Sequence, residues 1–279
     1  MLNGQDVVCI YQDVNLDSFA AAWCVWKRYP NAQFITQVDS SLPRQIEGRR
    51  VYILGATFSV TSLIDLATHA GSITVVDCKD SFEREFRTNR HQLPNNLFVV
   101  FDKERSIAGL AWDFFSFNQT RSPVVNYIED RTLWRFQYPE TRPVTTALMA
   151  YPLSFEAWDA LILQTDVGAL VQEGEVLLRR LIRDVEQVIR TTRRRITLAG
   201  YDVPAVNVSP ALASEAGVQL AKGEPFAVGY WDTPNGRVFD LVSVGDGVDV
   251  SELVAVYGGY GSRHEAAFVV PRDHPLCAA

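Results

Sequence analysis

The sequence has few of the residues that build metal-thiolate sites or disulfide frameworks. It contains four cysteines, Cys9, Cys24, Cys78 and Cys277, which lie far apart and form no Cys-x-x-Cys pair. This spacing argues against a zinc site and against disulfides, and it predicts a protein of the reducing cytoplasm.

The sequence also lacks long apolar runs and an excess of positive charge. No stretch is apolar enough to span a membrane, and no basic start is followed by a long apolar run. We therefore expect neither a membrane segment nor a signal peptide. With 26 Lys and Arg against 33 Asp and Glu, the net charge is −7. This balance disfavours binding of a nucleic-acid backbone over a broad surface, but it does not exclude a local basic groove that binds one.

What the sequence does contain is the pattern of a globular α/β protein. The 279 residues are 47% hydrophobic and are numerous enough for two domains. Apolar runs over 6–11, 49–56, 72–77 and 97–102 alternate with helical spacing over 16–29, 60–70 and 108–117. This alternation predicts a parallel sheet covered by helices on both faces. Ligands of such sheets bind beyond the carboxyl ends of the strands, where we expect Gln12, Asp13, Gly55 and Asp77 to converge.

A long helical pattern predicts where the chain divides into domains. We expect a sheet domain over 1–172, a connector helix over 173–195, and a smaller α/β domain over 196–279 with strands over 201–208, 225–232 and 236–244. The connector carries several arginines that could contact nucleic acid. At this acidic net charge, a solvated helix face is the favoured interpretation.

Eight motifs occur in the order found in one enzyme family. They are "CIYQDVNLDSFAAAW", "VYILGATFS", "VVDCKDSFEREF", "FDKERSIAGLAW", "YIEDRTLWRF", "YPLSFEAWDAL", "GDGVDVSELV" and "GGYGSRHEAAF". With these motifs the chain resembles the DHH phosphoesterases that carry a C-terminal DHH-associated domain, in the oligoribonuclease/exopolyphosphatase-related subgroup. The resemblance implies hydrolysis of phosphodiesters by two divalent ions, usually manganese, held by His and Asp side chains. It also implies a C-terminal domain that binds substrate phosphates.

Three acids remain at positions that the resemblance assigns to metal ligands. They are Asp17, Asp77 and Asp130. Three carboxylates could hold one Mn²⁺ or Mg²⁺ loosely, with waters completing the shell, or the site could hold no metal. Asp13 and Asn15 could be substitute ligands, although solvated turn residues are the favoured interpretation.

The other expected ligands are replaced. Gln12 stands in place of a His, Gly55 in place of the Asp that bridges both ions, and Cys78 and Lys79 in place of the His pair after Asp77. We expect Lys79 to pair with one of the three remaining acids and so to replace a cation. Cys78 could be a nucleophile with a thiolate favoured by Lys79, but inert packing is the favoured interpretation.

The last motif implies a substrate-binding loop in the C-terminal domain. Its residues are Gly258, Gly259, Gly261, Ser262, Arg263 and His264. Arg263 keeps the family's cation, whereas Ser262 stands in place of a His. Tyr260 replaces a glycine, so that either the loop backbone differs or the ring covers the pocket. Val242 replaces an Arg of the family pattern, and Ile107 replaces a Gly.

Three hypotheses for function follow. The first is a catalytically impaired pseudoenzyme that binds a nucleotide, a phosphodiester or a partner protein in an interdomain cleft, because all three strand-end metal motifs are altered together. The second is an active phosphodiesterase that cleaves short oligoribonucleotides or cyclic dinucleotides with one metal on Asp17, Asp77 and Asp130. The third is a purely structural interaction module, such as one half of a complex with an active relative or a homodimer.

Overall fold

The computed structural model describes residues 4–12, 16–36, 44–55, 58–116, 119–164 and 166–277, with the side chains of residues 44, 80, 81, 163 and 164 left aside. The chain divides into two compact units, Met1–Glu175 and Val176–Ala279. Helix α8 (Val167–Thr192) runs across the boundary between them. In the described part of the chain, no helix combines the length and the apolar character needed to cross a membrane.

The first unit contains a five-stranded parallel sheet with the order β2-β1-β3-β4-β5. The strands are β1 (Val7–Tyr11), β2 (Gln33–Thr36), β3 (Arg50–Leu54), β4 (Ser72–Asp77) and β5 (Leu97–Phe101). All five residues of β1 are buried, as expected for an interior strand with helices on both faces. This part of the structure confirms the predicted α/β fold; the edge strand β2 was missed because its four residues are only partly buried or exposed.

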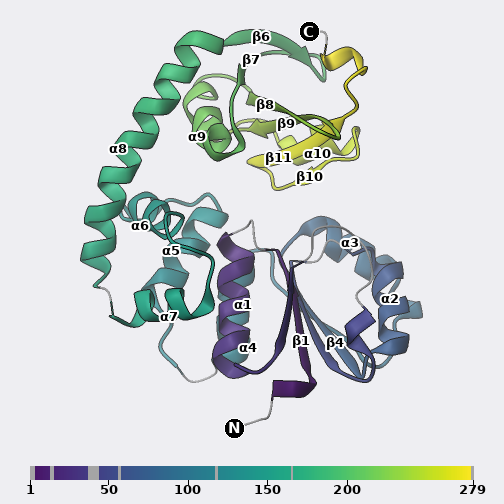
Figure 1. The fold of residues 1–279 in the computed structure, drawn as a ribbon. Helices are drawn as coiled ribbons and strands as arrows, with labels where there is room; N and C mark the ends of the chain where they lie inside the picture. The colour runs from purple at the N-terminus through teal and green to yellow at the C-terminus, as the bar shows by residue number, and fades with distance from the viewer. Residues whose placement is uncertain are drawn as a thin grey trace. The chain divides into compact units, whose positions relative to one another are not determined.

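Helices cover both faces of this sheet (Figure 1). One face packs against α1 (Leu16–Arg28), α4 (Ile107–Phe115), α5 (Pro123–Thr132) and α7 (Phe155–Gln164), and the other against α2 (Val60–His69) and α3 (Asp80–Thr88). Helix α6 (Thr141–Leu148) joins α5 and α7. Because successive strand residues point to opposite faces, Val7, Cys9 and Tyr11 enter the first core and Val8 and Ile10 the second.

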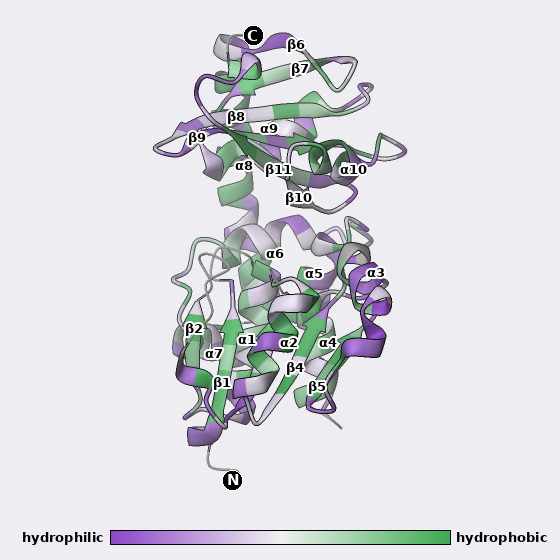
Figure 2. Cartoon of the chain, turned by 90° about the vertical axis from the view of Figure 1, so that its right-hand side faces the viewer, coloured by the Kyte–Doolittle hydropathy of each residue, from purple (hydrophilic) through white to green (hydrophobic). Residues whose placement is uncertain are grey.

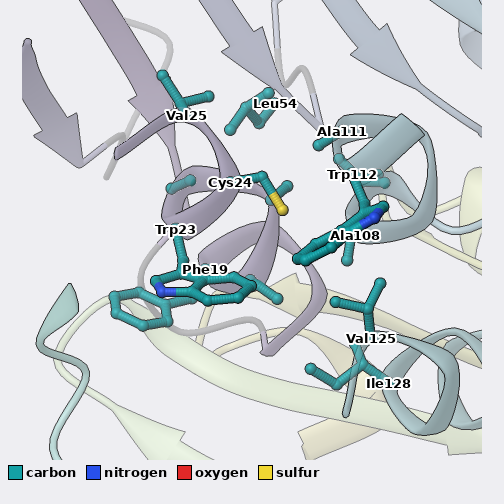
Figure 3. Packing of buried hydrophobic residues seen from close by; sticks show 14 of the residues in the cluster. Phe19, Trp23, Cys24, Val25, Leu54, Ala108, Ala111, Trp112, Val125 and Ile128 are labelled. Carbon is teal, nitrogen blue, oxygen red and sulfur yellow. The ribbon is translucent and has the colours of Figure 1, made fainter. Parts of the chain in front are cut away.

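The larger core is built around α1 and α4. Figure 3 shows Trp23 and Cys24 of α1 facing Ala108 and Trp112 of α4. The rings of Trp23 and Trp112 are stacked with centroids 5.8 Å apart. In Figure 2, β1 and β4 are largely in the green of hydrophobic residues, whereas α3 is largely in the purple of hydrophilic ones. This is expected for a helix with one face in water. The start of α4 is thereby held close to the start of α1.

The second unit contains a six-stranded mixed sheet with the order β10-β11-β9-β8-β7-β6. Its strands are β6 (Arg194–Leu198), β7 (Tyr201–Asn207), β8 (Ala227–Thr233), β9 (Gly236–Val242), β10 (Tyr260–Gly261) and β11 (Glu265–Val270). Only β7 and β8 pair in parallel, and α9 (Pro210–Leu220) is the crossover between them. Helix α10 (Val250–Ala255) covers one face, and α9 with the end of α8 covers part of the other.

Candidate functional site

The carboxyl ends of β1, β3 and β4 meet at one edge of the first sheet because these strands are adjacent and parallel. Asp77 is fully buried there, and its Oδ1 accepts the backbone N–H groups of Cys78 at 2.7 Å and Lys79 at 2.8 Å. Gly55 follows β3, and its N–H donates to the carbonyl of Val76 at 2.9 Å. The structure therefore brings Gly55 and Asp77 together, as the sequence predicts.

Asp17 lies in the first turn of α1 and is 2% exposed. Its two carboxylate oxygens accept the backbone N–H groups of Ile107 and Ala108, both at 2.9 Å. These donors belong to the first turn of α4 and have no acceptor within the helix. Burial raises the pKa of Asp17 to about 6, and the two N–H hydrogen bonds oppose this rise. Asp17 thus links α1 to the start of α4.

Two further side chains complete the start of α4 and were not singled out from the sequence. Ser106 caps the helix by accepting the N–H of Gly109 at 3.0 Å. The buried Glu129 accepts the N–H of Ser106 at 2.9 Å and forms ion pairs with Arg105 at 3.1 Å and Arg121 at 2.9 Å. The only sequence signal for Glu129 is the acidic pair at 129–130 in "YIEDRTLW", where the resemblance assigns a role to Asp130 alone.

Ile107 occupies the space beside Gly55. Gly55 has a φ of +68°, and a Cβ added to it would lie 2.7 Å from the Cδ1 of Ile107. Ile107 is itself buried, with 5% of its surface exposed. A side chain at position 55 therefore requires Ile107 to move, and a carboxylate at this position would meet an apolar group. Gly55 and Ile107 both replace residues of the family pattern. They are far apart in sequence but lie next to each other in the structure.

The surroundings of the Cys78 thiol disfavour its ionisation. Burial raises its pKa well above the usual range, the charges of Asp17 and Asp77 raise it further, and Lys79 opposes them. Cys78 also packs against the larger core. Burial and the charges of Asp17 and Asp77 therefore disfavour a thiolate nucleophile at Cys78. An ion pair between Lys79 and one of the acids stays a prediction.

Asp130 organises the segment that follows α5. It is 3% exposed, and its Oδ1 accepts the N–H of Gln137 at 2.9 Å. Its Oδ2 accepts the N–H of Tyr138 at 3.4 Å and the hydroxyl of Thr141. The same segment contains Trp134 and Phe136 with positive φ angles of 53° and 46°. These hydrogen bonds of the Asp130 carboxylate thus stabilise a local turn.

The described residues provide no ligand set for a pair of metal ions. No three His, Cys, Asp or Glu side chains among them are arranged to hold a metal. The oxygens of Asp17 and Asp130 already accept hydrogen bonds, and Gly55 supplies no bridging group. Asp13 and Asn15 lie outside the described residues, so their prediction as substitute ligands stays open.

The C-terminal loop is a compact turn in the second unit. Gly258 has a φ of +71° and, with Gly259, ends α10: their N–H groups donate to the carbonyls of Ala255 at 3.0 Å and Val254 at 2.9 Å. Gly261 pairs with Ala266 across β10 and β11. The backbone of this loop is therefore set by helix termination and strand pairing.

The polar residues of the loop make contacts within the second unit. The N–H of Ser262 donates to the carbonyl of Glu265 at 2.8 Å. Arg263 is exposed and donates to the carbonyl of Gly247 at 3.2 Å, and the half-buried His264 lies with its Nδ1 3.3 Å from the carbonyl of Ser243. Tyr260 is 74% exposed. Phosphate binding by Ser262, Arg263 and His264, with Gly258, Gly259 and Gly261, stays a prediction.

Comparisons with known proteins support the fold. No family model matches the chain. An uncharacterized protein of Acanthamoeba polyphaga mimivirus is 20% identical in an alignment 286 positions long, gaps included, and the match covers 92% of this chain but only 66% of that protein.

Two solved structures resemble the chain over nearly its whole length. A pGpG-specific phosphodiesterase from Vibrio cholerae is 14% identical with a TM-score of 0.50, and the match covers 95% of this chain and 93% of that one. An exopolyphosphatase-related protein from Bacteroides fragilis is 11% identical with a TM-score of 0.51, and the match covers 95% of this chain and 86% of that one. The chain therefore has a phosphodiesterase- and exopolyphosphatase-like α/β fold.

Proposed function

We propose that this protein is a DHH-type phosphoesterase homologue that has lost two-metal hydrolysis and binds a nucleotide or short phosphodiester ligand. The contact between Gly55 and Ile107 carries this proposal. The resemblance implies a metal-bridging Asp at position 55, and here the equivalent space lies 2.7 Å from the Cδ1 of Ile107. An apolar side chain that replaces a charged ligand cannot stabilise a pair of divalent ions.

The hydrogen bonds of Asp17 support the same proposal. Both oxygens accept N–H groups of α4, which a helix end needs whether or not a metal is present. The retention of this acid is thus explained by the fold, without hydrolysis.

The ligand class is proposed from the structural likeness. One neighbour acts on pGpG by its description, and the other is described as exopolyphosphatase-related. Nucleotides and short oligonucleotides share with these the anionic phosphate groups that a glycine-rich loop and Arg263 would contact. The pseudoenzyme hypothesis also includes a partner protein, in place of a nucleotide, as the ligand of the altered site.

An active enzyme with altered ligands is the second candidate. The observation that favours it is that Asp17, Asp77 and Asp130 are all buried in the first unit. Three carboxylates with waters could hold one Mn²⁺ or Mg²⁺.

Calorimetric titration with Mn²⁺ and a hydrolysis assay on pGpG separate the two candidates. We expect no heat of stoichiometric binding and no turnover. Turnover that disappears in Asp77→Asn, but persists in Asp65→Asn on the surface of α2, would overturn the proposal and establish an altered active site. Turnover by a contaminating nuclease would persist in both variants, and the Asp65 variant controls for a nonspecific effect of replacing an acid.

A further inference from the structure

The first sheet ends at β5, and the outer edge of this strand is apolar. Among the described strands β5 is the last in the order of its sheet and pairs with β4 alone. Its sequence is "LFVVF", without a charged residue, a proline or a glycine. An edge strand presents a row of unpaired backbone groups to other chains, and proteins protect such edges with charges, proline or short strands.

The other described edge strands carry such protection. Strand β6 begins with Arg194 and Arg195, β10 has only two residues, and β2 begins with Gln33 and ends with Thr36. Strand β5 lacks it, although its Phe98 is 54% exposed. The β5 edge therefore has the features of an edge that another strand covers.

The backbone groups that point outward from β5 follow from its pairing with β4. The N–H of Ile73 donates to the carbonyl of Asn96 at 2.8 Å. Because the backbone groups of successive strand residues alternate between the two edges, Phe98 also bonds toward β4. The N–H and carbonyl groups of Val99 and Phe101 therefore point to the open edge.

Two exposed aromatic rings lie on one side of the sheet beside this edge. Tyr52 pairs with Thr74 and Thr74 with Phe98, so that these side chains lie in one row on the same face. The ring of Phe114 in α4 lies with its centroid 6.3 Å from that of Tyr52 and is 46% exposed. Phe98 and Phe114 thus add exposed apolar surface to the face that borders the β5 edge.

We propose that β5 pairs antiparallel with β5 of a second copy of this chain, about a two-fold axis at Val99, and joins the two sheets into one. An axis normal to the sheet keeps each face on its own side. Val99 then lies opposite itself, Phe98 opposite Val100 of the second copy, and Leu97 opposite Phe101. Every pair is apolar, and the outward N–H and carbonyl groups of the two strands meet each other.

The charges that flank β5 fit this antiparallel arrangement. The chain enters the strand after a turn that contains the exposed Arg90. It leaves through Asp102, Lys103 and Glu104, which are all exposed and together carry a net negative charge. Antiparallel pairing brings the positive end of one copy toward the negative end of the other, whereas parallel pairing places like ends together. A strand of this same sequence therefore complements β5 in length, apolar character and charge.

The available area indicates a weak dimer. The exposed parts of Phe98 and Phe114 amount to roughly 200 Å² per copy. A standard interface buries about 800 Å² per partner, so the strand edge and its flanks must supply most of the contact. We therefore expect association in the micromolar range, with both monomer and dimer present in solution.

Sedimentation velocity of the full chain over a series of concentrations tests the proposal. We expect a monomer–dimer equilibrium. Phe98→Lys brings two ammonium groups close to the axis and should weaken the dimer about tenfold or more. Phe114→Lys should also weaken it, by a smaller factor. Met149→Lys is the matched control, because Met149 is 59% exposed at the end of α6 in the same unit, and it should leave the equilibrium unchanged.

Oxidative cross-linking of Val99→Cys tests the strand register. The proposed axis places residue 99 of each copy opposite its counterpart, with about 5.5 Å between the Cα atoms, a separation that a disulfide spans. We expect a covalent dimer of Val99→Cys, and none of the wild type or of Met149→Cys. Circular dichroism of each variant confirms that the fold is kept.

Three results would overturn the proposal. A chain that stays monomeric at every concentration would leave the β5 edge to a different protein. A dimer that persists in Phe98→Lys, or particles that grow without a limiting size, would show that the contact lies elsewhere or does not close on itself. A dimer that Phe98→Lys weakens but that Val99→Cys does not cross-link would refute the pairing of the two strands.

Discussion

The two units bury carboxylates in opposite ways. In the first unit, Asp17, Asp77 and Asp130 are buried and each accepts at least two backbone N–H groups. In the second unit, Asp240 is buried to a similar degree and accepts none within the described residues. Asp17 and Asp130 accept hydrogen bonds at both carboxylate oxygens, so their burial is explained by the helix start and the turn that they support. A buried acid without donors is accommodated in its neutral form, which burial and a neighbouring negative charge favour by raising its pKa.

The largest expected effect is at Asp130. Asp130→Ala removes the acceptor for Gln137, Tyr138 and Thr141, and we expect the free energy of unfolding to fall by about 4 kcal/mol. Urea unfolding followed by fluorescence measures this loss. A variant of normal stability would mean that the turn is held by other contacts and that the acid is retained for another reason.

Asp17→Ala should have the next largest effect. It leaves the N–H groups of Ile107 and Ala108 buried without acceptors, and we expect a loss of about 3 kcal/mol in the free energy of unfolding. Asp65→Ala on the exposed side of α2 is the matched control and should change stability little. If Asp17→Ala keeps full stability, the acid has no capping role and its retention points back to metal binding.

Asp240 should make stability depend on pH. Burial and the charge of Glu265 raise its pKa to about 8 in the folded protein, whereas the unfolded chain titrates at about 3.9. Between these values the folded state keeps a proton that the unfolded state has lost, so stability falls as pH rises and levels off above pH 8. Each pH unit inside this window costs at most about 1.4 kcal/mol.

Unfolding of the wild type and of Asp240→Asn at pH 6 and pH 8 isolates this contribution. Asp17, with a folded pKa of about 6, contributes mainly below this range. We expect the wild type to lose stability between the two values and the variant to lose less. Equal slopes for both proteins would show that Asp240 is ionised in the folded state at pH 6.

The smallest expected effect is at the contact between Gly55 and Ile107. Gly55→Ala should cost about 1–2 kcal/mol, because the residue has a positive φ and its Cβ would meet the Cδ1 of Ile107. Ile107→Val removes that methyl group, so the cost of Gly55→Ala should be smaller by about 0.5 kcal/mol in this background. Additive costs in the four-protein cycle would indicate that Ile107 does not occupy the space beside Gly55.

The sequence predicted those features of the fold that depend on residues close together in the chain. The alternation of apolar runs and helical spacing predicted the α/β architecture, and the strand ends at Gly55 and Asp77 followed from it. The roles of Asp17 and Glu129 did not follow, because their carboxylate oxygens accept N–H groups from the first turn and the N-cap of α4, which lie far from them along the chain. Asp240 was overlooked since a single acid in "VFDLV" also fits the solvent face of a strand.

By itself, the sequence determined which elements form, in which order, and that several metal-ligand positions of the resembling family are altered. These properties depend on local periodicity and on residue identity, which can be read along the chain. Only the tertiary structure decided that Ile107 fills the space beside Gly55, that the retained acids serve helix ends and turns, and that Phe98 lies in one row with Tyr52. Contacts between residues distant in sequence depend on packing and strand register, and no local pattern specifies them.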